Sequence, residues 1–192
     1  MPRRADPDLQ ERILNAAQKL WKKGAEKTLT MRAVAKAAGT NTPAVYRRFR
    51  KREDILRALL QRIQQDVKDS LRPCRSPEEV CERYLEYALS HTHEYELFYT
   101  HAYRLAPTAR SGRGLPLREQ RPAMALVEEK LAQRLGGSPT EHTRLSLALW
   151  TLAHGTAMIL ISKAIPENHA TELRSVFIAA VKTLINSSSS LS

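Results

Sequence analysis

A short segment, residues 42–48, brings a phenol, two guanidinium groups and several small side chains together at helical spacing. Val45 and Phe49 lie one helical turn apart and would face a protein core, which leaves Tyr46 and Arg47 on or beside the opposite side. Small side chains let a helix approach DNA closely, while hydroxyl and guanidinium groups donate hydrogen bonds to phosphates and base edges. The pattern therefore predicts a helix that reads the major groove of DNA.

A second short helix is expected directly before this segment. Thr30 is a suitable N-cap for residues 31–38, whose apolar side chains repeat at i, i+3, i+4 and i+7. Gly39 follows at the expected helix end, where a residue that tolerates a positive φ is favoured. Either Asn41 or Thr42 can cap the next helix. The sequence thus predicts two short helices joined by a tight turn.

Positive charge is concentrated around this helix pair. The chain has a formal net charge of +11, and counting residues 1–54 gives 14 basic and 6 acidic residues, a net charge of +8. From Lys27 to Arg52 there are eight Lys or Arg residues and no acidic residue. Such a region attracts a polyanion through the release of bound counterions.

Residues from about 9 to 60 resemble the DNA-binding domain of TetR-family transcriptional regulators. The likeness rests on ILNAAQKLWKKG, then MRAVAKAAG, then AVYRRF, and on the RED-I-L pattern that opens the following helix. Arg52 departs from the pattern, since the family usually has a lysine there. By position, the resemblance implies DNA contacts from Thr30, Arg32, Thr42, Pro43, Ala44, Tyr46, Arg47, Arg48 and Arg52.

Different roles are expected for these residues. Arg32 and Arg47 are the candidates for reading base edges, and the thymine methyl group is a candidate contact for Ala44. Tyr46, Arg48 and Arg52 are the candidates for binding phosphates.

Helical patterns cover most of the chain and predict an all-α protein of about nine helices. We expect a helix-turn-helix DNA-binding domain over residues 1–54, a helical ligand-binding and dimerisation domain over 55–186, and a disordered tail over 187–192. A first helix over Leu9–Lys23 should end at Gly24. The further predicted elements are helices over 51–71, 77–105 (two helices), 123–135, 139–165 and 169–186, with a long loop at 106–122.

The two helices over residues 77–105 are rich in aromatic and imidazole groups. A metal site is disfavoured, because His91 and His93 cannot share a helical face and no carboxylates cluster with them. Core packing and an aromatic-lined pocket remain as alternatives. The family resemblance favours a pocket for a small apolar or aromatic effector, with Tyr84, Tyr87, His91, Tyr99, Tyr103, Trp150 and His154 as candidate ligand-binding residues. Trp150 and His154 belong to a segment that resembles, more loosely, the W-x-x-x-H-G pattern common in the ligand-binding half of this family.

The segment from Leu145 to Ser162 contains no charged residue, which reaches the length of a membrane span. Its hydroxyl groups, histidine and glycine argue instead for a helix buried on two sides, with a partner subunit on one of them. The family resemblance likewise implies a homodimer formed through the last two helices, and no membrane partner is expected.

The function predicted from sequence is transcriptional regulation. The resemblance implies a repressor that binds a pseudo-palindromic double-stranded DNA operator as a homodimer and is released by a small molecule. A non-specific architectural DNA-binding protein without effector control is the alternative. No phosphate-binding loop, nucleophile elbow or metal-binding motif indicates an enzyme, and no cofactor is expected. Cys74 and Cys81 are predicted to be reduced thiols, and the chain is predicted to be cytoplasmic.

Overall fold

Helices make up all of the regular secondary structure in the described part of the chain. The computed structural model describes residues 8–105 and 121–189. Within these ranges it contains nine α-helices, one short 3-10 helix and no strand. The prediction of an all-α protein with about nine helices is therefore confirmed.

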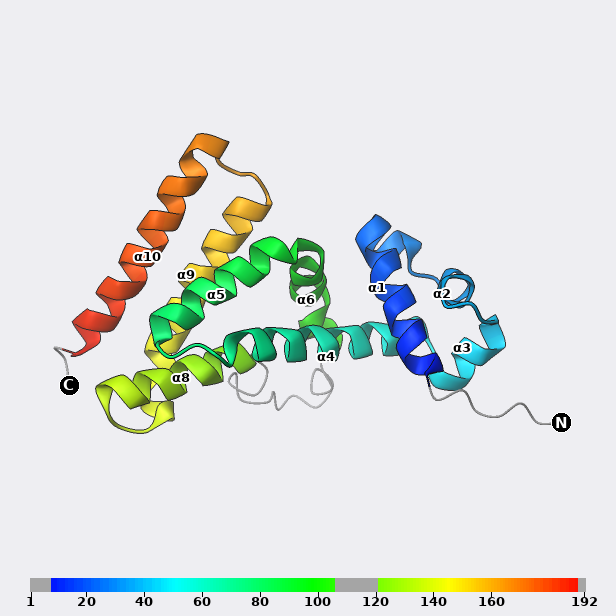
Figure 1. Cartoon of the computed structure of the whole chain (residues 1–192), viewed down its shortest axis with the longest axis horizontal. Helices are drawn as coiled ribbons and strands as arrows, with labels where there is room; N and C mark the ends of the chain where they lie inside the picture. Colours follow the sequence, from blue (N-terminus) through cyan, green and yellow to red (C-terminus); the bar gives the residue numbers. More distant parts are fainter. Residues whose placement is uncertain (1–7, 106–120, 190–192) are drawn as a thin grey trace. The chain divides into compact units, whose positions relative to one another are not determined.

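The helices fall into two compact units. The first unit contains α1 (Leu9–Thr28), α2 (Met31–Ala37), α3 (Thr42–Arg48), the first part of α4 (Arg52–Leu71) and α6 (Thr92–Leu105) from His93 onward (Figure 1). The second unit contains the rest of α4, then α5 (Pro77–Ser90), α8 (Pro122–Leu135), the 3-10 helix η2 (Pro139–His142), α9 (Thr143–Ile161) and α10 (Glu167–Ser189).

The first unit extends through Ile63, beyond residue 54, where we had placed the domain boundary. Within this extension, Arg62 of α4 donates hydrogen bonds to the Glu11 carboxylate and to the Asn15 side chain of α1, both at 2.7 Å. The division between the units therefore falls within α4, which contributes residues to both.

The first helix is longer than the sequence predicted. α1 continues through Gly24 to Thr28, so the expectation that Gly24 ends it is wrong. The Thr28 hydroxyl donates a hydrogen bond of 2.6 Å to the carbonyl oxygen of Leu20. A Cβ at Gly24 would lie 2.4 Å from Cγ2 of Thr28. A side chain at position 24 would therefore force Thr28 to shift, so the role of Gly24 is to admit the Thr28 methyl group and not to end the helix.

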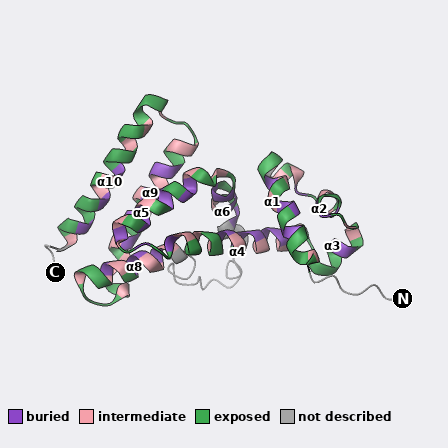
Figure 2. Ribbon diagram, viewed as in Figure 1, coloured by how far each residue is buried: buried purple, intermediate pink, exposed green. Residues whose placement is uncertain are grey.

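In the second unit α9 packs against α5, α8 and α10, and α10 also contacts α5. Leu149 and Ala157 of α9 and Phe177 and Val181 of α10 are at most 1% exposed. Full burial of a Leu, Phe or Val side chain contributes about 1.5–3 kcal/mol. Figure 2 shows the buried residues of these helices on the sides that face their neighbours.

The outer sides of α9 and α10 are also apolar. Leu147, Met158 and Ile159 of α9 and Val176 and Leu184 of α10 are 36–56% exposed. By length and composition, the segment from Pro139 to Ile161 could cross a membrane. Here it is divided into η2 and α9, which corrects the single helix predicted over 139–165.

The last helix also exceeds its predicted length. α10 continues to Ser189, where we had predicted a disordered tail from residue 187. The Ser188 hydroxyl donates to the carbonyl oxygen of Leu184 at 2.9 Å, which satisfies a carbonyl of the last turns. The rest of the predicted tail and most of the loop predicted at 106–122 lie outside the described residues.

Candidate nucleic-acid interface

Local capping places α2 and α3 as the sequence predicted. The Thr30 hydroxyl accepts a hydrogen bond of 3.1 Å from the backbone N–H of Ala33 and caps α2. Gly39 has a φ of 65°, so the predicted left-handed helix end is confirmed. Of the two candidate caps for α3, the structure uses Asn41, whose side-chain oxygen accepts from the N–H of Ala44 at 2.9 Å.

One side of α3 is anchored in the first unit. Val45 is fully buried and Phe49 is 6% exposed, as expected for the side that faces the core. Ala44 is also buried, with 5% of its surface exposed. The sequence predicted that Ala44 could meet a thymine methyl group, but its side of the helix is covered by packing. A contact between Ala44 and a thymine methyl group is therefore not available in this conformation.

The other side of α3 is open to solvent. Tyr46 is 50% exposed, and Pro43, Arg47 and Arg48 are exposed as well, while Thr42 is half-buried. The exposed side of α3 thus carries hydrogen-bond donors, from Tyr46, Arg47 and Arg48, and one small side chain, Pro43. This is the combination that the sequence predicted for a face that reads a DNA groove. The helix carries them on a short rigid rod that is capped at its start and held by packing on its opposite side.

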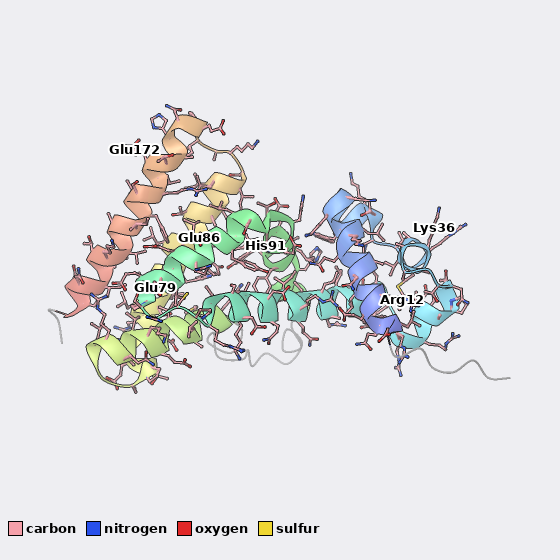
Figure 3. All side chains as sticks on the ribbon, in the orientation of Figure 1. Arg12, Lys36, Glu79, Glu86, His91 and Glu172 are labelled. Atoms are coloured by element: carbon pink, nitrogen blue, oxygen red, sulfur yellow. The ribbon has the colours of Figure 1, made fainter. Side chains whose placement is uncertain are left out.

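Residues on α2 extend this exposed surface. Thr30 and Arg32 are exposed, and Lys36 is exposed one turn further along the same face. The Lys36 side chain extends outward from α2 (Figure 3). Lys36 is not among the DNA contacts predicted from the sequence, although its spacing of four residues from Arg32 places the two on one helical face. We define the groove face as Thr30, Arg32, Lys36, Pro43, Tyr46, Arg47 and Arg48.

The start of α4 differs from the sequence expectation. Arg52, a candidate phosphate ligand, forms an ion pair of 2.7 Å with Glu26 of α1. Asp54 also accepts a hydrogen bond of 3.2 Å from the N–H of Lys51, so a carboxylate already occupies the helix N-terminus. Lys51 itself is exposed. Its ammonium group is therefore better placed than the paired guanidinium of Arg52 to meet a phosphate.

A hydrogen bond from α1 supports the helix pair. Arg12 donates from Nε to the carbonyl oxygen of Ala38 at 3.4 Å, which provides a partner at the C-terminal end of α2. A positive group at this end of a helix is also favoured by the helix dipole. Arg12 and Lys36 are labelled in Figure 3 on α1 and α2.

A polar cluster within the first unit joins α1 to α6. Glu94 is 4% exposed and accepts from Lys22 at 2.7 Å and from Gln18 at 3.1 Å. Burial alone would raise the pKa of Glu94, but hydrogen bonds from these two side chains and from its own backbone N–H outweigh it and lower the pKa. The Trp21 indole N–H also donates to the carbonyl oxygen of His93 at 3.1 Å. The sequence carried no local signal for this cluster, because its partners lie far apart along the chain.

The candidate ligand-binding residues do not form one site. Tyr84 and Trp150 line the same small cavity in the second unit. The rings of Trp150 and His154 are parallel with centroids 5.5 Å apart, which places His154 next to this cavity. Burial, and then the nearby guanidinium of Arg121, lower the pKa of His154.

The remaining candidates lie elsewhere. Tyr87 and His91 stack on each other with centroids 4.3 Å apart and do not line the cavity. Tyr99 belongs to α6 in the first unit, where its ring lies 4.6 Å from that of Tyr95. The side chain of Tyr103 lies outside the described residues.

No group of three or more His, Cys, Asp or Glu side chains in residues 8–105 and 121–189 has the arrangement of a metal site. Cys74 and Cys81 are buried and form no disulfide with each other. Burial followed by the carboxylates of Glu78 and Glu82 raises the pKa of Cys81 to about 12, so this thiol stays protonated at neutral pH.

Two family models match the sequence. Residues 13–59 match the model described as bacterial regulatory proteins of the tetR family, and residues 78–184 match the Tetracyclin repressor-like C-terminal domain. No curated protein sequence matches the chain.

Several solved structures are similar in fold. A protein of unknown function from Rhodococcus sp. RHA1 is 21% identical with a TM-score of 0.70, covering 97% of this chain and 98% of its own. The multidrug binding protein EbrR, solved in complex with imidazole, is 21% identical with a TM-score of 0.57, covering 92% of each chain. NalD, the secondary repressor of the MexAB-OprM multidrug efflux pump in Pseudomonas aeruginosa, is 18% identical with a TM-score of 0.55, covering 90% of this chain and 95% of its own.

Proposed function

The chain belongs to the tetR family of bacterial regulatory proteins, and on this premise we propose that it is a sequence-specific, ligand-responsive transcriptional repressor. As a family member it is a DNA-binding transcriptional regulator. In our proposal a homodimer binds a pseudo-palindromic operator in the cytoplasm, and a small-molecule effector releases it. The protein acts by binding and carries out no enzymatic reaction.

The groove face is the observation that carries this proposal. Arg47 and Arg32 are exposed, and in our proposal they read base edges. Tyr46 and Arg48 bind phosphates and fix the position of α3 in the groove. Lys51 takes the phosphate contact that we had expected from Arg52, since Arg52 is paired with Glu26.

The outer sides of α9 and α10 support the proposed two-fold dimer. These sides expose large apolar side chains, among them Met158 and Val176. A second copy of the same face would cover them in an isologous interface. Gly155 lies on this side of α9, four residues before Ile159, and a Cβ built on it meets no atom within 4 Å. Such open space within one chain leaves room for the close approach of a partner helix.

Effector control is proposed to act through the second unit. A ligand changes operator affinity only by the ratio of its affinities for the DNA-binding and released conformations. The covalent route is short, because α4 contributes residues to both units. Typical couplings of this kind amount to about 1–3 kcal/mol, which is a change in operator affinity of about 5- to 150-fold.

The proposal is tested by selecting fragments of the host genome that the purified protein binds. Affinity is then measured for the selected sequence and for a scrambled duplex of equal length and composition at one salt concentration. A sequence-specific regulator should prefer the selected site by about 10³-fold or more. Equal affinity for both duplexes, with a strong dependence on salt, would instead identify an architectural DNA-binding protein.

A further inference from the structure

The run of positive charge that follows α3 ends in a residue whose charge is held inside the protein. Five of the six residues at positions 47–52 are basic, and four of these five are exposed. The fifth is Arg52, the first residue of α4, which donates from Nη2 to Oε1 of Glu26 at 2.7 Å. One guanidinium of the run is therefore bound by a carboxylate of the same chain.

Arg52 lies close to the helix that we propose reads the groove. It is four residues beyond Arg48, the last residue of α3, and a chain of that length spans at most about 14 Å. The major groove is about 12 Å wide and has a phosphate backbone on each side. With α3 in the groove, a released guanidinium at position 52 is thus within reach of a flanking phosphate.

The ion pair has no local explanation in the stability of either helix. Arg52 begins α4, where the helix dipole disfavours a positive charge, and Glu26 lies in the last turn of α1, where it disfavours a negative one. The two side chains are 34% and 43% exposed, and ion pairs at such exposure add little to stability. The pair therefore affects the charge that meets DNA more than it affects folding.

We propose that Glu26 is an internal competitor of the DNA phosphate, which holds the guanidinium of Arg52 and so removes one backbone contact from each subunit. The inference rests on the proposed function and adds to it a residue that sets the affinity for DNA. A phosphate contact carries no sequence information, so Glu26 lowers the affinity for the operator and for unrelated DNA alike. It limits the sequence-independent part of binding, which otherwise holds a regulator on the excess of non-operator DNA.

A double-mutant cycle tests this proposal. Glu26→Gln keeps the shape of the side chain but removes its charge, and Arg52→Gln removes the partner. The natural chain, both single variants and the double variant are titrated with the selected operator and with the scrambled duplex at about 50 and about 200 mM salt. Glu53→Gln is the matched control, because it removes a carboxylate from the first turn of α4 but leaves the ion pair in place. Circular dichroism confirms that each variant is folded.

Glu26→Gln should bind both duplexes more tightly, because each subunit gains a phosphate contact. One such contact steepens the slope of log affinity against log salt concentration by about 0.9, so a rise from about 50 to about 200 mM salt costs about 3.5-fold more affinity per subunit. For a dimer, the gain over the natural chain should be about tenfold larger at the lower salt concentration than at the higher one.

The gain should depend on Arg52. In the Arg52→Gln background, Glu26→Gln should change the affinity no more than Glu53→Gln changes that of the natural chain. Glu26→Ala leaves the guanidinium no acceptor at this position and should show the same gain, so it provides a second test if Glu26→Gln is poorly folded.

An unchanged salt slope in the Glu26 variants would overturn the inference, because it would show that no phosphate contact is gained. A gain that persists without Arg52, or that is no larger than the gain of Glu53→Gln, would also overturn it, because charge alone would then account for the effect. The proposed function fails by a different result, namely equal affinity of the natural chain for the operator and for the scrambled duplex. The cycle compares variants on each duplex separately, so the two failures are distinguishable.

Discussion

Replacing Gly155 by leucine should have opposite effects on the folding of one chain and on the assembly of two. Within one chain a Cβ at this position meets no atom within 4 Å, so the first atom of the larger side chain fits without a clash. Leucine also favours a helix interior over glycine by about 0.8 kcal/mol. Gly155→Leu should therefore leave the folded monomer as stable as the natural chain, or slightly more stable.

The dimer should respond in the opposite direction. If α9 faces its copy across a two-fold axis, each interface contains two introduced leucines. Overpacking typically costs about 1–3 kcal/mol per site. With two such sites, the dimer should lose about 2–6 kcal/mol of association free energy. Its dissociation constant should then rise by between about 30-fold and about 20,000-fold.

Analytical ultracentrifugation over a range of protein concentrations measures this change. Gln133→Leu is the matched control, because Gln133 is exposed on α8 rather than on the apolar faces of α9 and α10. The control should dimerise like the natural chain. If Gly155→Leu dimerises unchanged, or if the natural chain is a monomer at micromolar concentration, the proposed interface is refuted.

Three further outcomes are expected. Arg47→Ala should weaken binding to the selected operator by about 1–3 kcal/mol per half-site in a gel-shift titration, while binding to scrambled DNA changes much less; an equal loss on both duplexes would remove Arg47 from base readout. Lys51→Ala should reduce the slope of log affinity against log salt concentration by about 1 per subunit, and Arg52→Ala should reduce this slope less. A larger effect of Arg52→Ala would contradict the proposal that Arg52 stays paired with Glu26 when DNA is bound. Glu94 has a lowered pKa, so its stabilising contribution is present above the unfolded pKa of about 4.3 and is lost as pH falls through the folded value. Glu94→Gln should therefore lower the free energy of unfolding at pH 7 by about 1.5–3 kcal/mol, as measured by urea titration. Below about pH 5, the free energy of unfolding of the variant should depend less on pH than that of the natural chain. The same pH dependence in both proteins would contradict the stabilising role of the Glu94 carboxylate.

Local sequence signals were sufficient to predict the helix-turn-helix. Caps such as Thr30 and the left-handed position at Gly39 depend only on neighbouring residues, so their chemistry can be read from a few positions. The buried side of α3 was predictable in the same way from the spacing of Val45 and Phe49.

Other features depend on residues far apart in the chain. The resemblance marked Ala44 as a DNA contact, but packing from outside α3 decides that it is buried. The pairing of Arg52 with Glu26 likewise joins two helices, and no spacing rule connects them. The burial of Glu94 against α1 is a third case.

The candidate ligand site shows the same limit. Aromatic composition identified Tyr84 and Trp150, which do share a cavity. It also selected Tyr87 and His91, whose rings are used in stacking on each other. Residue type alone does not determine which aromatic side chains converge, because convergence depends on how three helices cross.

The central claim is that the exposed side of α3 reads base edges in the major groove, and methylation interference at guanine N7 tests it most directly. That atom lies in the major groove and is the usual acceptor for an arginine. We predict that methylation at a symmetrically placed pair of guanines in the selected operator blocks the natural protein, and that Arg47→Ala loses the interference at these two guanines, whereas any interference that depends on Arg32 remains. Insensitivity of the natural protein to methylation, or the same interference pattern with Arg47→Ala, would contradict the account.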